Sequence, residues 1–299
     1  MKNGSCWLDT DGRHIQAHGG AMLEHEGMYY WYGENKDADT VGHAVPFLGF
    51  SCYSSKDMRS WKNEGLVFAS ERNDPESEIH SSRVGERPKV LYNRKTNRFV
   101  LWFHLDDRDY RYARIGIAVS DNPTGPFVFV RSVQPDGRDS RDMTVYLDED
   151  GSAYCVCSTD LNRTLLISKL DDDFAGFAGE HRTACLLQFR EAPVVLKENG
   201  VYYMFTSGCT GWDPNAMLYG VSGSIMGDWR LIDNPCAGPN ARKTFFGQSA
   251  NSFKANGQWY IMLDHWNKED LRTSGYSFLP IRFEGGEVEV RWTEEFPGV

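Results

Sequence analysis

The sequence is poor in positive charge and has no long apolar run. Its 299 residues include 32 Lys and Arg against 42 Asp and Glu, which gives a net charge of −10. Nowhere do about 18 apolar residues follow one another, so a transmembrane helix is excluded. The acidic balance argues against nucleic acid or an anionic membrane as the main partner, because both require a basic surface.

The first residues contain no apolar segment of the kind found in signal peptides. We therefore expect a cytoplasmic location for the chain as given, and a secreted or periplasmic one only if a signal was removed.

Cysteines with metal or redox spacing are also missing, since Cys155 and Cys157 are separated by a single residue. We expect free, mostly buried thiols, which suit a reducing compartment.

Helical periodicity is scarce, whereas aromatic residues are abundant. Nine Trp, 14 Tyr and 17 Phe make up 13% of the chain, alongside 29 Gly. This composition favours an all-β fold. Aromatic side chains fill β cores and also offer flat apolar faces to sugar rings.

Five segments share one pattern, in which an apolar strand, a tight polar turn and an aromatic-rich strand follow one another. Four of the turns carry Glu-Gly, Asp-Gly or Asn-Gly, the pairs that supply positive φ in two-residue hairpins. The segments are residues 21–32, 88–103, 143–156, 192–205 and 249–263.

Each hairpin precedes a third strand and then a polar turn that leads to a fourth, outer strand. The third strands are predicted at residues 49–55, 114–120, 164–168, 217–222 and 277–281. Four strands repeated five times are typical of a five-bladed β-propeller with a central channel. We expect residues 1–299 to form this single all-β domain; an irregular two-sheet sandwich is the alternative.

The repeat also locates a set of equivalent residues. The innermost strands of a propeller line its channel, so the residues that open these strands meet at one mouth. These positions hold His18, Glu86, Asp142, Glu191 and Gln248. Three carboxyl groups at one mouth should raise the pKa of at least one, as a general acid requires. The alternative is that these residues only cap strands and hold the channel through water.

Carboxyl groups spread around a channel suit glycoside hydrolysis, in which two such groups flank the scissile bond. Groups on different blades are expected to lie far apart. A wide separation leaves room for water and predicts inversion of the anomeric centre.

Short motifs then follow one another in a characteristic order. They are Trp7-x-Asp9-Thr10-Asp11-Gly12, Ala17-His18-Gly19-Gly20, Tyr30-Trp31-Tyr32-Gly33-Glu34-Asn35-Lys36, Gly85-Glu86-Arg87-Pro88, Ser140-Arg141-Asp142, Arg190-Glu191-Ala192-Pro193 and Thr210-Gly211-Trp212-Asp213-Pro214-Asn215. The series resembles glycoside hydrolase family 43, and more narrowly its exo-β-1,3-galactanase (galactan 1,3-β-galactosidase) subgroup.

The resemblance implies an inverting, exo-acting enzyme that releases galactose from β-1,3-galactan or its oligosaccharides. It implies that Glu191 is the general acid and that Asp142 tunes the pKa of that acid. The usual blade-one Asp base of the family is replaced by His18 in this chain, a departure that the subgroup shares. The resemblance then implies that Gln248, with Glu86 nearby, manages the water. A neutral amide is a poor base, so the choice between these two residues stays open.

Further residues are expected to contact substrate or extend the pocket. The substrate-binding set is His18, Glu34, Tyr110, Asn162, Thr210 and Trp212, with Trp212 stacking on a galactose face. A polar loop with His104, Asp106 and Asp107 extends the pocket. We expect no cofactor; a channel cation such as calcium, bound through His265 and water, is an alternative that we do not expect.

Three rival functions remain at this point. One is another family 43 glycosidase, an α-L-arabinofuranosidase or β-xylosidase, against which the missing blade-one Asp counts. The others are a catalytically inactive carbohydrate-binding propeller and a metal-dependent enzyme that uses His18 and its acidic neighbours. We expect a monomer with no appended carbohydrate-binding module and no macromolecular partner other than galactan.

Overall fold

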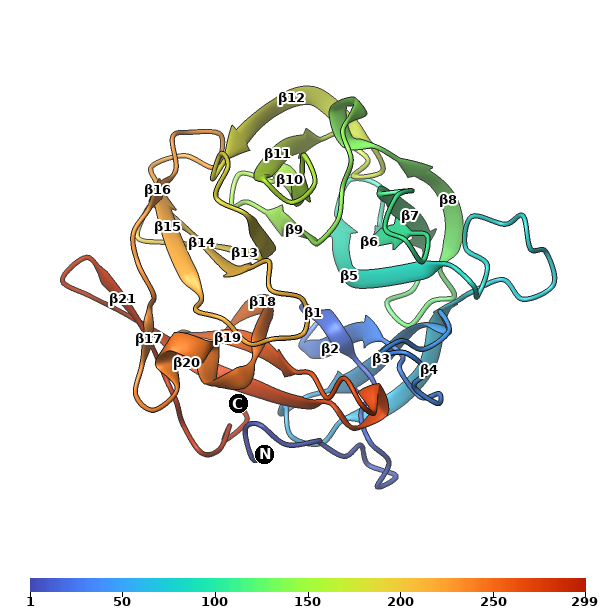
Figure 1. The fold of residues 1–299 in the computed structure, drawn as a ribbon, viewed down its shortest axis with the longest axis horizontal. Helices are drawn as coiled ribbons and strands as arrows, with labels where there is room; N and C mark the ends of the chain where they lie inside the picture. The colour runs from blue at the N-terminus through green and yellow to red at the C-terminus, as the bar shows by residue number, and fades with distance from the viewer.

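The computed structural model describes all 299 residues, and nearly all of its regular structure is β-sheet. Five antiparallel sheets surround a common axis (Figure 1), which confirms the five-bladed propeller and excludes the sandwich. Three short 3-10 helices, η1 (Pro135–Gly137), η2 (Ala241–Phe246) and η3 (Leu271–Thr273), are the only helices. None has the length and apolar character that crossing a membrane requires.

Each blade uses four consecutive strands, numbered from the axis outward. Blade one is β1 (His18–His25), β2 (Met28–Glu34), β3 (Gly49–Ser55) and β4 (Lys62–Ala69); blade two is β5 (Val84–Asn93), β6 (Arg98–Asp106), β7 (Arg114–Ser120) and β8 (Val128–Val133). Blade three is β9 (Met143–Leu147), β10 (Ala153–Thr159), β11 (Thr164–Leu170) and β12 (Phe177–Ala184). Blade four is β13 (Arg190–Glu198), β14 (Val201–Gly208), β15 (Leu218–Ser222) and β16 (Arg230–Leu231); blade five is β18 (Gln248–Ala255), β19 (Gln258–His265), β20 (Gly275–Glu284) and β21 (Glu287–Arg291).

Three of the predicted two-residue turns are confirmed, and the fourth is wrong. Glu26-Gly27, Asn199-Gly200 and Asn256-Gly257 each have two positive φ angles and join directly paired strands. The Asp150-Gly151 pair instead lies in a five-residue loop between Leu147 and Ala153. There the amide of Asp148 donates to the carbonyl of Ser152, so Ser152 pairs one residue earlier in the chain than with the Glu149 that a two-residue turn requires.

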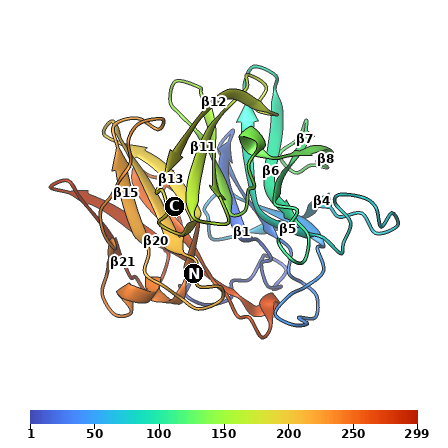
Figure 2. The ribbon, with the colours of Figure 1, turned by 45° about the horizontal axis from the view of Figure 1, so that its top comes forward.

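The core consists of five apolar clusters, one between each pair of neighbouring blades. The inner strands also contact one another in the closed cyclic order β1, β5, β9, β13 and β18. Viewed at 45° to the first orientation, β1 and β13 run through the thickness of the molecule (Figure 2). The ring of inner strands therefore forms a rigid support for side chains at either mouth of the channel.

The two ends of the chain lie side by side (Figures 1 and 2). The N-terminal amine donates to the carbonyl of Phe296 at 2.8 Å, and the Asn3 side chain donates to the carbonyl of Thr293 at 2.9 Å. Trp7 packs between blades one and five, with its ring 5.9 Å from that of Trp31 and 4.7 Å from that of Phe278. The N-terminal segment thus seals the seam of the ring.

Blade five has an additional outer strand that the sequence did not suggest. Strand β17 (Cys236–Ala237) pairs in parallel with β21 and adds a fifth strand to that sheet.

Candidate active site

A cavity of about 310 Å³ opens at one mouth of the central channel and receives side chains from all five blades. Eight of the ten predicted site residues line it: Glu34, Glu86, Tyr110, Asp142, Asn162, Glu191, Trp212 and Gln248. Lys36, Arg87, Arg141, Gly211 and Trp266 complete the wall. A larger cavity of about 630 Å³ is lined by the opposite ends of the inner strands and contains none of the five equivalent residues.

Local distortions of the inner strands aim these side chains at the pocket. The register shifts directly after the equivalent residue in β1, β5 and β13, and one residue later, after Ser249, in β18. In three blades the next residue has a positive φ: Gly19 at 56°, Arg87 at 55° and Ala192 at 51°. A bulge of this kind re-aims a side chain and ends regular pairing. Two of these positions are not glycine, so sequence reasoning could not find the bulges from composition.

Glu191 is the proton-bearing carboxyl group of the pocket. Burial, together with the negative charge of Asp142, raises its pKa to about 7, against the opposing effect of Arg87. Its Oε1 accepts a hydrogen bond from Gln248 Nε2 at 3.2 Å. A carboxyl group poised near neutrality is suited to act as a general acid.

Asp142 is fixed by two donors beside Glu191. Its Oδ2 lies 2.9 Å from the guanidinium of Arg87 and accepts the backbone N–H of Ala192 at 3.1 Å. Both contacts are to the same oxygen, so the Asp142 carboxyl group is held in a fixed position beside Glu191. Arg87 therefore pairs with this carboxylate, whereas Arg141 pairs with Asp139.

Gln248 has a partner at every hydrogen-bonding position of its amide. Its Oε1 accepts from Arg87 at 2.6 Å and from Trp266 Nε1 at 3.0 Å, while Nε2 donates to Glu191 and to Ser207 Oγ. An amide oxygen has two lone pairs. Both are occupied, so Gln248 holds its neighbours in place and has no free acceptor for a water molecule.

Glu86 is the ionised counterpart of Glu191. Its Oε2 lies 3.2 Å from His104 Nδ1, and its Oε1 accepts from the Tyr110 hydroxyl at 2.9 Å. Burial would raise its pKa, but His104, Lys36 and Tyr110 lower it to about 2. Each carboxylate oxygen keeps a second lone pair for a sugar hydroxyl or water.

The prediction of a polar loop at residues 104–107 is partly wrong. His104 and Asp106 belong to strand β6, and both side chains are fully buried. The His104 ring lies between Asp106 and Glu86 and contacts both carboxylates. Only Asp107 begins the loop, and it does not line the cavity.

The remaining wall residues vary in their contacts. Glu34 is buried, forms an ion pair with Lys36 at 2.7 Å and accepts the backbone N–H of Arg87 at 3.0 Å. The buried Oδ1 of Asn162 has no protein partner, so it is available to a ligand hydroxyl. Trp212 is 41% exposed and stands nearly perpendicular to Trp266, with the ring centroids 5.9 Å apart.

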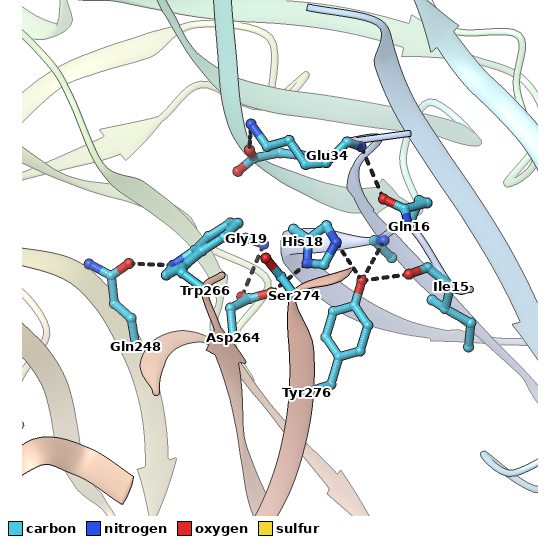
Figure 3. Close-up of polar contacts among 12 residues, drawn as sticks. Ile15, Gln16, His18, Gly19, Glu34, Gln248, Asp264, Trp266, Ser274 and Tyr276 are labelled. Atoms are coloured by element: carbon cyan, nitrogen blue, oxygen red, sulfur yellow. Dashed lines mark hydrogen bonds and ion pairs between the residues drawn. The ribbon is translucent and has the colours of Figure 1, made fainter. Parts of the chain in front are cut away.

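Two residues of the predicted substrate-binding set are not placed in the pocket. His18 is fully buried, stacks on Tyr276 and lies beneath Trp266, which separates it from Gln248 (Figure 3). Its Nδ1 lies 3.4 Å from Asp264 and its Nε2 lies 3.1 Å from the Tyr276 hydroxyl. Thr210 is turned into its own loop, where its hydroxyl donates to the carbonyl of Asp213.

The structure contains one cluster with the composition of a metal site. Ligand atoms of Glu86, His104 and Asp142 lie within 4.8 Å of one another. Both imidazole nitrogens already face carboxylates, and Asp142 is paired with Arg87. The donors are thus engaged with protein partners, which favours an ion-pair network. His265, the alternative cation contact, lies 2.7 Å from Ser277 Oγ.

Comparisons with known proteins agree with this fold. The profile of glycosyl hydrolases family 43 matches residues 16–279. A family 43 β-1,3-galactosidase solved with galactodeoxynojirimycin is 36% identical over 99% of both chains, with a TM-score of 0.95. No curated protein sequence gives a match.

Two exo-β-1,3-galactanases are also similar. The enzyme from Phanerochaete chrysosporium, solved with β-1,3-galactotriose, is 30% identical over 97% of this chain and 66% of its own, with a TM-score of 0.90. The enzyme from Clostridium thermocellum is 34% identical over 98% of this chain and 65% of its own, with a TM-score of 0.88. This chain therefore spans about two thirds of their length. With the profile covering most of its residues, the chain belongs to glycosyl hydrolases family 43.

Proposed function

We propose that this glycoside hydrolase is an inverting exo-β-1,3-galactosidase that releases galactose from β-1,3-galactan or its oligosaccharides. The observation that carries the proposal is the pairing of a protonated Glu191 with an ionised Glu86 in one pocket at the channel mouth. The galactose-specific names of the similar enzymes support the choice of sugar. Trp266 forms part of the pocket wall above the buried His18.

The reaction needs one proton delivered and one removed. Glu191 gives its proton to the leaving glycosidic oxygen as the bond from that oxygen to C1 breaks. A water oxygen bonds to C1 from the opposite face, and its proton passes to a base, so the released galactose has the inverted configuration. The charge of Asp142 raises the pKa of Glu191 and so helps to hold its proton before the reaction, and the Arg87 guanidinium pairs with Asp142.

The geometry favours Glu86 over Gln248 as the group that manages the water. Glu86 retains free lone pairs, whereas the oxygen of Gln248 is saturated by Arg87 and Trp266. Gln248 is better suited to orient Glu191, to which it donates. No step requires a cofactor, and Trp212 offers an apolar face to a sugar ring.

The decisive experiment is product analysis on β-1,3-galactobiose and β-1,3-galactan with the native chain and Glu191→Gln. General acid catalysis contributes roughly 10²–10⁴-fold, so the variant should lose activity by about that factor while still binding substrate. The anomer released first, followed by NMR, should be α. Cleavage of arabinosides or xylosides but not galactosides would replace the sugar assignment, and binding without cleavage would favour a carbohydrate-binding propeller.

A further inference from the structure

We propose that His104 and Asp106 are positioning residues of the hydrolysis, and that they act as a buried imidazolium–carboxylate pair that holds Glu86 charged and oriented toward the substrate. The proposal rests on the function proposed above for the pocket. Neither residue lines the cavity, so both act through Glu86.

The hydrogen bonds form a continuous chain from the core to the pocket. Asp106 Oδ2 lies 2.8 Å from His104 Nε2, and His104 Nδ1 lies 3.2 Å from Glu86 Oε2. His104 and Asp106 have no solvent exposure. Water therefore cannot replace either partner, and the ring has only one orientation that satisfies both nitrogens.

This geometry requires a protonated ring. A neutral imidazole carries one N–H and one lone pair, and the lone pair would then face a carboxylate oxygen. Ionised carboxylates only accept hydrogen bonds, so both nitrogens must donate. Burial alone would lower the pKa of His104, but its hydrogen bonds to Asp106 and Glu86 raise it to about 9. The ring thus stays charged wherever Glu191 can act as an acid.

Asp106 controls the second oxygen of Glu86 as well. Its Oδ1 accepts the backbone N–H of Asp107 and of Ala113, each at 2.9 Å, and so ties together both ends of the 107–113 loop. That loop carries Tyr110, whose hydroxyl donates to Glu86 Oε1 at 2.9 Å. One buried carboxylate therefore fixes both contacts of Glu86, one through His104 and one through Tyr110.

The charges around the ring are few. Glu86 comes from β5, Asp106 from β6 itself, and Tyr110 lies over the ring at 5.9 Å. Asp142, which precedes β9, has an oxygen within 4.8 Å of the Glu86 and His104 ligand atoms. The positive charge of Lys36 also lowers the pKa of Glu86. Without the imidazolium, this corner of the pocket would hold three carboxylates against two cations, Lys36 and Arg87, which would favour protonation of Glu86.

The test is the pH dependence of kcat/KM for β-1,3-galactobiose in the native chain, Asp106→Asn and His104→Gln. In Asp106→Asn the new amide can keep both backbone contacts while its NH₂ faces Nε2, which leaves the ring neutral. We expect the acidic limb, set by ionisation of Glu86, to move up by about one to two pH units. In the native chain Glu86 stays charged down to about pH 2, so no such limb should appear above pH 3.

His181→Gln is the matched control, because His181 also lies 3.2 Å from a carboxylate, Asp136, but on the outer strand β12. It should leave the pH profile unchanged. A merely structural role for His104 and Asp106 would lower kcat/KM without moving the limb, and that result would overturn the proposal.

A measurement without substrate separates this proposal from the assignment of the sugar. In histidine-selective ¹⁵N NMR, with His104→Gln used for assignment, both His104 nitrogens should remain protonated from pH 5 to about pH 8.5. A neutral ring below pH 7 would refute the imidazolium whatever the substrate proves to be. A charged ring together with no galactose release would instead refute the proposed function alone.

Discussion

At the scale of single residues, the pocket shows two glutamates of opposite character. Glu191 is buried beside Asp142, so its pKa rises to about 7; Glu86 is equally confined but faces His104 and Lys36, so its pKa falls to about 2. Pairs of carboxyl groups whose pKa values are pushed apart identify the acid and its partner. The division of roles thus depends on neighbours of these residues and not on their type.

A small anion should restore activity to a variant that lacks the Glu86 carboxylate. We expect Glu86→Ala to lose roughly 10²–10⁴-fold in kcat on an aryl β-galactoside. Azide, which fits the vacated space and needs no base, should restore the rate and give α-galactosyl azide. Product NMR checks this prediction. If Gln248→Ala is rescued by azide and Glu86→Ala is not, Gln248 is the group that manages the water.

The raised pKa of Glu191 also predicts a pH-dependent stability. The folded chain holds this proton up to about pH 7, whereas the ordinary value is 4.5, so the unfolded chain releases it earlier. Stability therefore falls as pH rises from 4.5 to 7. Glu191→Gln removes this effect, and we expect it to be more thermostable than the native chain at pH 8, by at most about 3 kcal/mol. Calorimetry at pH 8 and pH 4 checks this; an equal difference at both would contradict it.

At the scale of elements, the bulge after Glu191 couples three blades. Ala192 has a φ of 51°, its N–H donates to Asp142 and its carbonyl accepts from Ser249 Oγ at 2.8 Å. The left-handed conformation is tolerable for Ala and natural for Gly, but strained for a β-branched residue. The bulge is therefore the element that sets the direction of the acid.

We expect Ala192→Gly to retain activity and Ala192→Val to lose it. The valine should cost about 1–3 kcal/mol in unfolding free energy through backbone strain. Displacement of Glu191 by about 1 Å should lower kcat roughly 10²-fold. Urea unfolding and galactose release measure the two effects. A fully active valine variant would show that the bulge does not orient the acid.

The strands could be predicted from the sequence, but several contacts of the candidate site could not. Strands β3 and β7 lie at the predicted residues 49–55 and 114–120, because apolar alternation and turn pairs are local signals. The five equivalent positions followed from the repeat. His18 was expected in the pocket, but Trp266, which is distant in sequence, lies between it and Gln248. The proposed roles of His104 and Asp106 were missed because they depend on the register between β5 and β6. That register places His104 opposite Glu86 and Asp106 at the end of β6.

At the scale of the whole molecule, the propeller supports its pocket only while the ring is closed. No strand crosses from the last blade to the first, since each blade is built from consecutive strands. Closure depends on the contact of β1 with β18 and on the N-terminal segment, whose Trp7 is 3% exposed and packs on Trp31 of blade one and Phe278 of blade five. The pocket includes residues from both of these blades.

Trp7→Ala should therefore weaken the molecule as a unit. Loss of a buried Trp side chain costs about 3–5 kcal/mol of unfolding free energy. Because the seam joins all five inter-blade cores into one ring, the circular dichroism signal of the sheets and the activity should be lost at the same temperature, below that of the native chain. Below that temperature kcat should equal the native value, since Trp7 touches no pocket residue directly. Trp212→Ala is the reciprocal control. Loss of this exposed pocket side chain should raise KM and leave the melting temperature unchanged. If Trp7→Ala instead lost activity well below its melting transition, blades one and five would separate locally. The seam would then control the shape of the pocket and not the stability of the whole fold.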